Sequence, residues 1–402
     1  MNQSLQFRDF RYYLGSRFLA LASHQVLVVA LSQKVYEITR SPIHLGYIGL
    51  TLFLPKFVFA LLAGHAADRF DRRRLILFCR VIQISAIMGI VLFAHSGFQP
   101  ISVLYIFLFL LGMANAFDGP ASQAIVTNIV PEEHFTHGVT WHSSVTQASF
   151  IIGPALGGWL YSIFGKAEFV LWVVIAMRGS SALLLALVKA RKQTTETPGA
   201  ISWDNLFAGI RYVFQKRIIL ASISLDLFAV LFGGAVALMP IFANDILKVG
   251  PEGLGLLRAA PSIGAVLIAF YIARRPKIER SGVVLLWAVV VFGLATILFG
   301  LSKNFYLSLA ILMVLGGADM ISVIIRSVLV QMETPQEMRG RVSAVNFVFI
   351  GASNELGEFE SGLTAQWFGV VPAVVLGGLG TLAVATLWTK KFPELRDYVS
   401  KQ

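Results

Sequence analysis

Twelve apolar stretches, each as long as a membrane-spanning helix, dominate this sequence. Short polar segments separate them, and only 14% of the residues are charged. A bilayer core about 30 Å thick is crossed by about 20 apolar residues in a helix, and every stretch meets that length. The sequence therefore predicts an all-α membrane protein with twelve transmembrane helices. The stretches are 12–35, 43–66, 75–95, 101–127, 139–164, 168–188, 219–246, 253–273, 283–301, 305–332, 342–366 and 371–390.

The lysine and arginine residues predict the orientation of these helices. If the N-terminus is cytoplasmic, 22 of the 33 basic residues fall in cytoplasmic segments. Only four fall in external loops: Arg40, Lys166, Lys248 and Lys303. Cytoplasmic loops carry an excess of lysine and arginine in membrane proteins, and an even number of spans fits this distribution. We therefore expect both termini to be cytoplasmic.

Composition excludes several classes of protein. The net charge of +11 does not indicate nucleic-acid binding, because the basic residues lie in short loops between apolar stretches. Cys79 is the only cysteine, and the seven histidines show no ligand spacing, so we expect no disulfide, no metal and no cofactor. No cleavable signal peptide is expected, because the first stretch is long enough to remain as a span. Without a long soluble stretch, an enzyme is not expected.

A polar segment at 189–217 divides the chain in the middle. Residues Lys192–Gly199 are rich in threonine and end in Pro-Gly, as in a linker. From Ser202, a possible helix cap, apolar residues recur at helical spacing, which predicts an amphipathic helix on the inner leaflet. We expect a six-helix bundle over 1–188, a linker over 189–217 and a second bundle over 218–402. The apolar face would consist of Trp203, Leu206, Phe207, Ile210, Val213 and Phe214.

The two halves share a pattern of glycine and proline. Chance could align such residues in glycine-rich helices, but an ordered recurrence over more than a hundred residues favours duplication. Parallel six-helix repeats are a known transporter architecture, with the substrate site near the membrane midplane. With a shift of 204 residues, these identical residues coincide: Gly112 with Gly316, Pro131 with Pro335, Glu133 with Glu337, Gly153 with Gly357 and Gly158 with Gly362.

The loop after the second stretch reads Gly-His-Ala-Ala-Asp-Arg-Phe-Asp-Arg-Arg over residues 64–73. It resembles the loop signature of the major facilitator superfamily, Gly-x-x-x-Asp-Arg-x-Gly-Arg-Arg/Lys, except at Asp71. The resemblance implies that Asp68 locks the outward-facing state and that the arginines pair with acidic residues or lipid headgroups. Gly64 would permit close helix packing. Positive-inside charge alone would explain Arg69, Arg72 and Arg73, but not the Gly-x-x-x-Asp-Arg spacing.

A second motif lies in the fifth stretch, where Gly153, Pro154, Gly157 and Gly158 resemble the end of the superfamily's antiporter signature, Gly-Pro-x-x-Gly-Gly. The signature's upstream glycines are absent. Such small residues would let this helix press against a helix of the other half, and in the family the motif accompanies export. General small-residue packing is the alternative interpretation.

Two further stretches, 317–341 and 354–362, resemble the bacterial branch of the superfamily that includes enterobactin-type siderophore exporters. This resemblance implies an exporter in the bacterial inner membrane. Proton-coupled relatives often carry an arginine in the fourth span, four residues before a glycine. Here that position is Leu108, so proton coupling by that route is not expected.

Ionisable residues inside the stretches are candidate coupling residues, since each costs at least about 2.5–3.5 kcal/mol to insert. Glu355 and Glu358 are three residues apart and share a helix face. Two carboxylates this close in a low dielectric do not both ionise easily, which suits proton exchange or a cationic substrate. Ion pairing with arginines would be the structural alternative. The other candidates are Asp118, Arg178, Asp226 and Asp319.

Together these patterns predict a secondary active transporter that exports a small organic molecule, such as a siderophore, drug or metabolite. We expect alternating access, a proton gradient as the energy source, and a monomer surrounded by membrane lipids. No nucleotide-binding Gly-x4-Gly-Lys-Ser/Thr motif is present. Three alternatives stay open: an uncoupled or inward facilitator, a lysophospholipid flippase, and a membrane receptor without transport.

Overall fold

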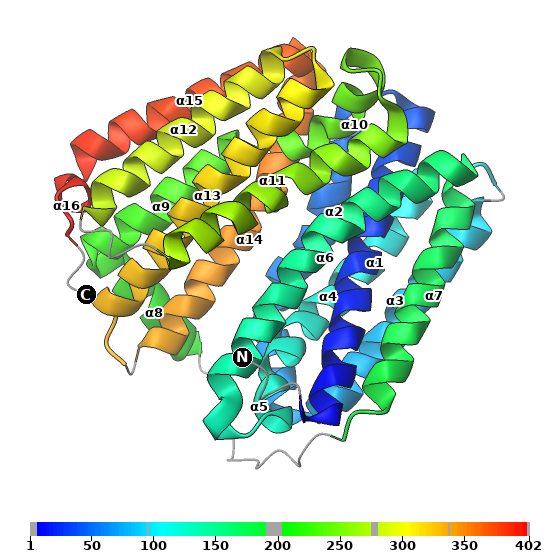
Figure 1. Cartoon of the computed structure of the whole chain (residues 1–402), viewed down its shortest axis with the longest axis horizontal. Helices are drawn as coiled ribbons and strands as arrows, with labels where there is room; N and C mark the ends of the chain where they lie inside the picture. The colour runs from blue at the N-terminus through cyan, green and yellow to red at the C-terminus, as the bar shows by residue number, and fades with distance from the viewer. Residues whose placement is uncertain (1–5, 95, 190–202, 275–279, 337, 400–402) are drawn as a thin grey trace. The chain divides into compact units, whose positions relative to one another are not determined.

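The computed structural model describes residues 6–94, 96–189, 203–274, 280–336 and 338–399, and most of these residues are helical (Figure 1). Every predicted apolar stretch coincides with a helical segment, which confirms the fold class. The α-helices are α1 (Arg8–Thr39), α2 (Pro42–Arg69), α3 (Arg72–Ala94), α4 (Ser102–Ala124), α5 (Val126–Ile129), α6 (Phe135–Phe164), α7 (Ala167–Ala186), α8 (Trp203–Gln215), α9 (Arg217–Phe232), α10 (Met239–Ile241), α11 (Gly250–Ala273), α12 (Ser281–Leu301), α13 (Phe305–Glu333), α14 (Arg339–Phe368), α15 (Val370–Lys391) and α16 (Pro393–Arg396).

Within the described residues, ten helical segments are long and apolar enough to cross a membrane. The two long helices outside this group are α6 and α14, the fifth and the eleventh of the predicted spans. Both are 30 residues long but carry many hydroxyl, amide or carboxyl groups. These two helices occupy the same place in the two predicted repeats.

The stretch predicted as one helix over 219–246 is broken in the structure. After α9 the chain forms a short 3₁₀-helix, Ala235–Leu238, then α10 and a π-helical turn, Phe242–Ile246. The break follows Gly233 and Gly234, and the latter lies directly against the backbone of Gly357 in α14. A side chain at Gly234 would not fit, so the glycine pair both weakens the helix and permits this close approach.

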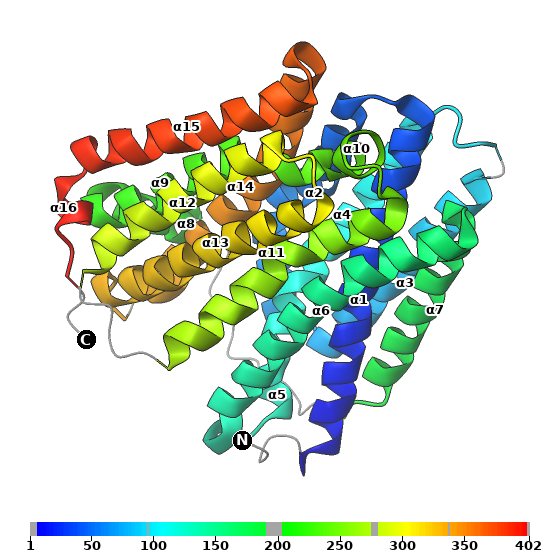
Figure 2. The ribbon, with the colours of Figure 1, turned by 45° about the horizontal axis from the view of Figure 1, so that its top comes forward.

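The chain forms two compact units, which are described separately. Unit 1 comprises Met1–Lys34 and Thr51–Ala200, and unit 2 comprises Val35–Leu50 and Ile201–Gln402. In unit 1, α3 packs against both α4 and α7. In unit 2, α13 packs between α11 and α12, while α15 lies along α12 and α9 (Figure 2). The C-terminal end of α1 and the beginning of α2 therefore belong to unit 2.

The predicted amphipathic helix is present as α8, in unit 2. Of its side chains, those from Gly209 onward are described. Val213 is buried in the core beside α9, Gly209 lies against the backbone of Arg341, and the Tyr212 hydroxyl donates to the Glu333 carbonyl at 3.0 Å. The end of this helix is thus anchored on protein. The predicted cap Ser202 and the linker residues 190–202 lie outside the described residues.

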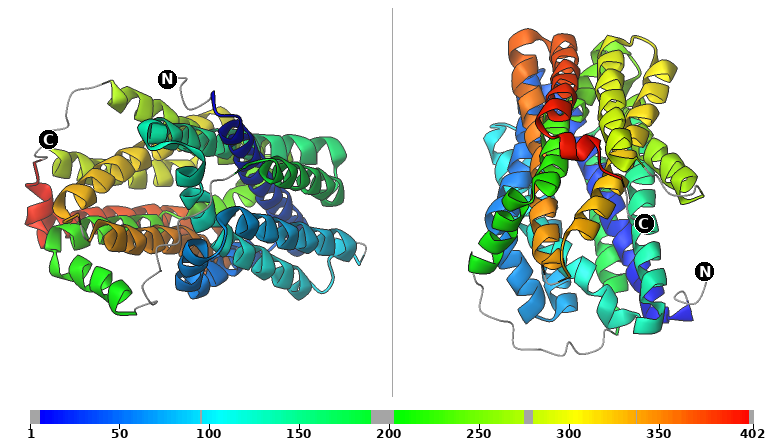
Figure 3. Two further views of the ribbon diagram at one scale, coloured as in Figure 1. Left: turned by 90° about the horizontal axis from the view of Figure 1, so that it is seen from below. Right: turned by 90° about the vertical axis from the view of Figure 1, so that its left-hand side faces the viewer.

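Short α16 completes unit 2, packing against α9, α12 and α15 (Figure 3). Its Glu394 pairs with Arg217 at the beginning of α9, at 3.1 Å.

Candidate functional site

A buried network of polar side chains joins α3, α4 and α7 in unit 1. We call it the first polar cluster: Arg80, Gln83, Asn115, Asp118 and Arg178. Arg80 Nη1 lies 3.0 Å from Asp118 Oδ2 and donates to Gln83 Oε1 at 2.8 Å. Gln83 Nε2 donates in turn to Asn115 Oδ1 at 2.8 Å, and Arg178 Nη1 donates to Gln83 Oε1. The Gln83 amide therefore links two guanidinium groups that are 4% and 1% exposed.

Some hydrogen-bond donors of the first polar cluster have no acceptor among the described residues. Within the described residues, Arg178 Nε and Nη2 and Arg80 Nε have no hydrogen-bond partner. Asp118 accepts a further hydrogen bond from Ser122 at 3.2 Å. The sequence predicted Asp118 and Arg178 as separate candidates, and the structure brings them into one network. It missed Arg80 and Gln83, although a charged residue inside an apolar stretch was the signal that could have found Arg80.

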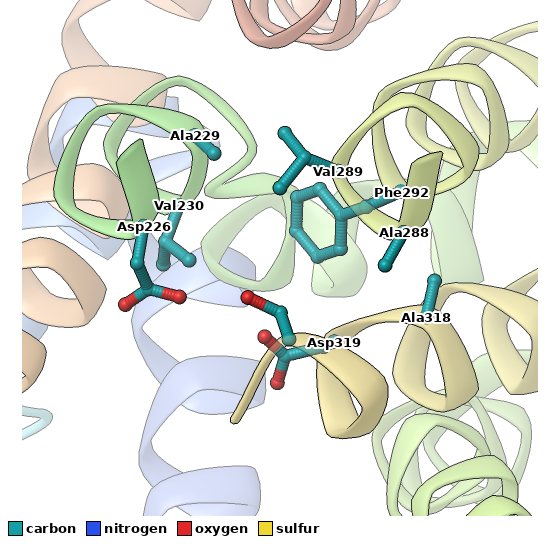
Figure 4. A pocket seen from close by; sticks show the side chains of 9 residues that line it. Asp226, Ala229, Val230, Ala288, Val289, Phe292, Ala318 and Asp319 are labelled. Atoms are coloured by element: carbon teal, nitrogen blue, oxygen red, sulfur yellow. The ribbon is translucent and has the colours of Figure 1, made fainter. Parts of the chain in front are cut away.

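A second group of polar side chains lies on α9 and α13 in unit 2, next to apolar residues of α12. We call it the second polar cluster: Asp226, Asp319, Ser322 and Arg326. Asp226 and Arg326, 6% and 2% exposed, form a buried ion pair. Asp226 and Asp319 both line a small cavity closed by apolar side chains such as Phe292 (Figure 4). The sequence placed Asp319 and Arg326 on one helix face, but the partner of Arg326 is Asp226 on another helix.

Asp319 differs from Asp226 in its surroundings. Asp319 is half-buried as a residue, and no basic side chain of the described residues acts on its carboxyl group. Ser322, one turn further along α13, has a buried hydroxyl without a partner in the described part of the chain. Asp319 is therefore a carboxyl group inside an apolar bundle without a compensating cation among the residues that the structure describes.

The two glutamates predicted to act together lie on α14 and are half-buried. Glu358 lies within electrostatic range of Arg258, which matches the ion-pairing alternative. The Glu358 side chain also packs on Gly49, where a Cβ would lie 2.6 Å from Oε2. The neighbouring Glu360 accepts a hydrogen bond from Thr364 at 2.6 Å. The structure thus gives Glu358 a basic neighbour.

The loop motif connects the ends of several helices of unit 1. Arg72 donates to the Ala124 carbonyl at 3.0 Å and to Asn128 Oδ1 at 2.7 Å, and its Nη2 lies 3.9 Å from Asp68. Arg73 donates to the Leu185 carbonyl at 3.2 Å, at the end of α7. These two arginines therefore bind carbonyl groups at the C-terminal ends of α4 and α7.

Two residues of the loop differ from the expectation. Asp71, where the superfamily signature has glycine, accepts a hydrogen bond from the Arg74 amide at 2.8 Å and so caps the beginning of α3. A Cβ added at Gly64 would meet no described atom within 4 Å. The close packing expected at Gly64 is not seen. The side chain of Asp68 is 66% exposed, and Arg69 ends α2.

The glycine motif of α6 lies against α1 of the same unit. A Cβ at Gly153 would lie 3.0 Å from the Ala22 carbonyl oxygen, and one at Gly157 would lie 3.0 Å from the Val26 Cα. Pro154 stands inside the helix between them. The small residues therefore permit a close contact with α1 of the same unit, while contact with a helix of the other half stays a prediction. Gly158, the last residue of the motif, is buried.

One polar cluster of unit 2, at the C-terminal end of α1, was not predicted. The Tyr36 hydroxyl donates to Asp245 Oδ2, and Arg40 Nη1 lies 3.4 Å from Asp245 Oδ1. Nearby, Gly46 packs on the backbone of Phe359, and Gly362 packs on Gly46. The end of α1 and the beginning of α2 are thus attached to α14 and to the π-helical turn. Sequence spacing gives no signal for this contact, because the partners are about 200 or more residues apart.

Comparison with known proteins gives one family and many relatives. The family model described as a transmembrane secretion effector matches residues 10–400. The chain is 22% identical over 388 residues to the staphyloferrin A transporter of Staphylococcus aureus, covering 94% of this chain and 95% of that one. It is 23% identical over 380 residues to macrolide efflux protein A of Streptococcus pyogenes, covering 91% and 92%. It is 24% identical over 400 residues to the multidrug efflux pump Tap of Mycobacterium tuberculosis, covering 93% of each.

Solved structures support the same fold. The crystal structure of a mutant of the nucleoside transporter NupG superimposes with a TM-score of 0.76 at 14% identity. The superposition covers 96% of this chain and 100% of that one. At this identity the likeness concerns the fold, a helical transporter fold, and not the cargo.

Proposed function

The chain belongs to the transmembrane secretion effector family of the major facilitator superfamily, and on that basis we propose that it exports a small organic molecule in exchange for protons. It is a multi-pass membrane transporter and not an enzyme. The names of two relatives support export, since both are described as efflux proteins, and a third is described as a staphyloferrin A transporter. A siderophore, a drug or a metabolite is the class of cargo proposed.

The observation that carries proton exchange is the position of Asp319. A carboxyl group can gain or lose a proton, whereas an arginine keeps its charge. Asp226 has Arg326 as its ionic partner, and Asp118 has Arg80. Asp319 has no such cation among the described residues, and it borders a cavity. A neutral, protonated Asp319 suits this environment in one state, and release of the proton would accompany exposure to water.

The remaining parts of the proposal concern arrangement. We propose two six-helix halves, 1–188 and 218–402, that alternate in access around the membrane midplane. The coincidence of Gly112 and Gly316 supports the repeat: a Cβ at either would meet the backbone of the second helix of its half, at Leu52 and Pro261 respectively. We also propose that both termini are cytoplasmic, because of the distribution of basic residues. The protein is further proposed to be a monomer in the bacterial inner membrane.

Reconstituted vesicles would test the exchange. Purified protein is placed in vesicles with an acidic lumen, and the accumulation of radiolabelled erythromycin, a macrolide, and of staphyloferrin A is measured. Wild-type protein should accumulate at least one of them only while the lumen is more acidic than the medium. Asp319→Asn should lose gradient-driven accumulation but keep exchange of labelled for unlabelled cargo, because the amide cannot carry a proton.

Asp397→Asn is the matched control, since Asp397 is an exposed aspartate outside the membrane-spanning helices. Flux that is independent of the pH gradient in wild-type protein would instead indicate an uncoupled facilitator. Competition by lysophospholipid alone would indicate a flippase. If Asp319→Asn stays gradient-driven and Glu358→Gln does not, the coupling group is on α14 and the role of Asp319 is wrong.

A further inference from the structure

The first polar cluster lies in a part of unit 1 where positive charge exceeds negative charge. Arg80 and Arg178 both lie within electrostatic range of the His24 side chain. Asp118 is the carboxylate that compensates them within the described residues of the cluster, and it pairs directly with Arg80. Two buried guanidinium groups, 4% and 1% exposed, therefore share one carboxylate.

Arg178 is the least compensated of these cations. It lies about 16 Å along α7, at 1.5 Å per residue, and so is near the middle of the membrane. One of its nitrogens donates to Gln83, while Nε and Nη2 have no partner among the described residues. A buried guanidinium cannot lose its charge, and its unpaired N–H groups are costly. Among the residues that the structure describes, no group accepts from these two donors, so they are available to an anionic ligand.

We propose that the first polar cluster binds an anionic group of the exported molecule, a carboxylate, sulfonate or phosphate, with Arg178 as the principal contact. This inference rests on the proposed function, because it names the class of cargo. The free Nε and Nη2 of one guanidinium offer two donors to one anion, the arrangement in which arginine binds carboxylates best. Arg80 already has Asp118, so the uncompensated charge is centred on Arg178.

A set of probes that differ only in charge tests this. Naphthalene-2-sulfonate, naphthalene-2-methanol and 2-naphthylmethylammonium share one aromatic body but are anionic, neutral and cationic. Binding is followed by the thermal stability of the purified full chain in an uncharged detergent, since a ligand of the folded state raises it. The anion should raise the unfolding temperature in a saturable way, and the other two should not. In Arg178→Gln the Kd for naphthalene-2-sulfonate should rise by roughly tenfold to a hundredfold.

Matched variants separate charge from folding. Arg396→Gln removes an arginine that lies outside the membrane-spanning helices and should leave the Kd unchanged. Arg178→Lys keeps the charge but not the two donors, so its Kd should be intermediate. Where Arg178→Gln does not fold, Asn115→Asp takes its place. A carboxylate beside Gln83 would compete with the anionic probe for Arg178 and so weaken the binding of the probe.

A second experiment asks whether the bound anion belongs to a cargo molecule or to a lipid headgroup. It compares lysophosphatidylglycerol with lysophosphatidylcholine. Stabilisation by the former but not by naphthalene-2-sulfonate would assign the site to a lipid headgroup. The proposal is wrong if all three naphthalene probes act alike, if no anion stabilises wild-type protein, or if folded Arg178→Gln binds the anion as wild type does. None of these measurements uses a proton gradient, so they stand apart from the test of proton exchange.

Discussion

The two halves of this protein each bury an aspartate–arginine pair, but they differ in the charge that remains. Around the Arg80–Asp118 pair the excess is cationic and centred on Arg178. Around the Asp226–Arg326 pair the excess is a carboxyl group, Asp319. A carboxylate can be neutralised by a proton, whereas the charge of a guanidinium can be compensated only by an anion. This difference is the basis of the two proposals, proton exchange in the second half and anion binding in the first.

Breaking the ion pair of the second half should have the largest effect. Arg326→Leu would leave Asp226 unpaired beside Asp319, and loss of one member of a buried pair costs about 3–5 kcal/mol. We expect most of this variant to be lost from detergent extracts, as judged by fluorescence-detected size-exclusion chromatography. Removing both charges, in Asp226→Leu with Arg326→Leu, should restore much of the folded fraction.

The corresponding change in the first half, Arg80→Leu, should cost less. Asp118 would lose its direct partner, but Arg178 acts on it electrostatically and could replace that partner. Equal losses of folded protein in Arg326→Leu and Arg80→Leu would show that the excess charge does not distinguish the two halves.

The glycines that the repeat places at the same position should behave alike. Gly112→Ala and Gly316→Ala each put a methyl group against the backbone of a neighbouring helix, at Leu52 and at Pro261. Overpacking of this kind typically costs about 1–3 kcal/mol. The drop in unfolding temperature of the two variants should be similar. Gly64→Ala is the control, and it should leave that temperature unchanged because no described atom lies within 4 Å.

The helices could be predicted from the sequence because length and hydropathy determine them. The partners inside the bundles could not. Seven-residue spacing placed Arg326 on the face of Asp319, yet its partner on α9 depends on how the helices pack. Gln83 was missed because an isolated amide in an apolar stretch gives no signal until two arginines converge on it. The break after Gly233 likewise depends on the approach of Gly357, on another helix.

Exchanging one residue between the clusters sharpens the comparison further. Asn115 of the first cluster and Asp319 of the second occupy the same position under the shift of 204 residues. Asn115→Asp should raise the unfolding temperature slightly, by an amount equivalent to about 1 kcal/mol, because the new carboxylate compensates Arg178 through the Gln83 network. A lowered unfolding temperature would contradict an excess of positive charge in the first half.

The smallest expected effect concerns the loop motif, which only the first half carries. In the second half the corresponding sequence, Ala273-Arg274-Arg275-Pro276-Lys277, has no aspartate. Asp71 caps α3 through the Arg74 amide, so Asp71→Ala should cost about 1 kcal/mol. Asp71→Gly, which restores the residue usual in the superfamily signature, should cost only a few tenths, because glycine is tolerated at a helix N-cap. The order of the two unfolding temperatures is the measurement. If glycine is as harmful as alanine, then Asp71 acts through its charge on the neighbouring arginines and not through the cap.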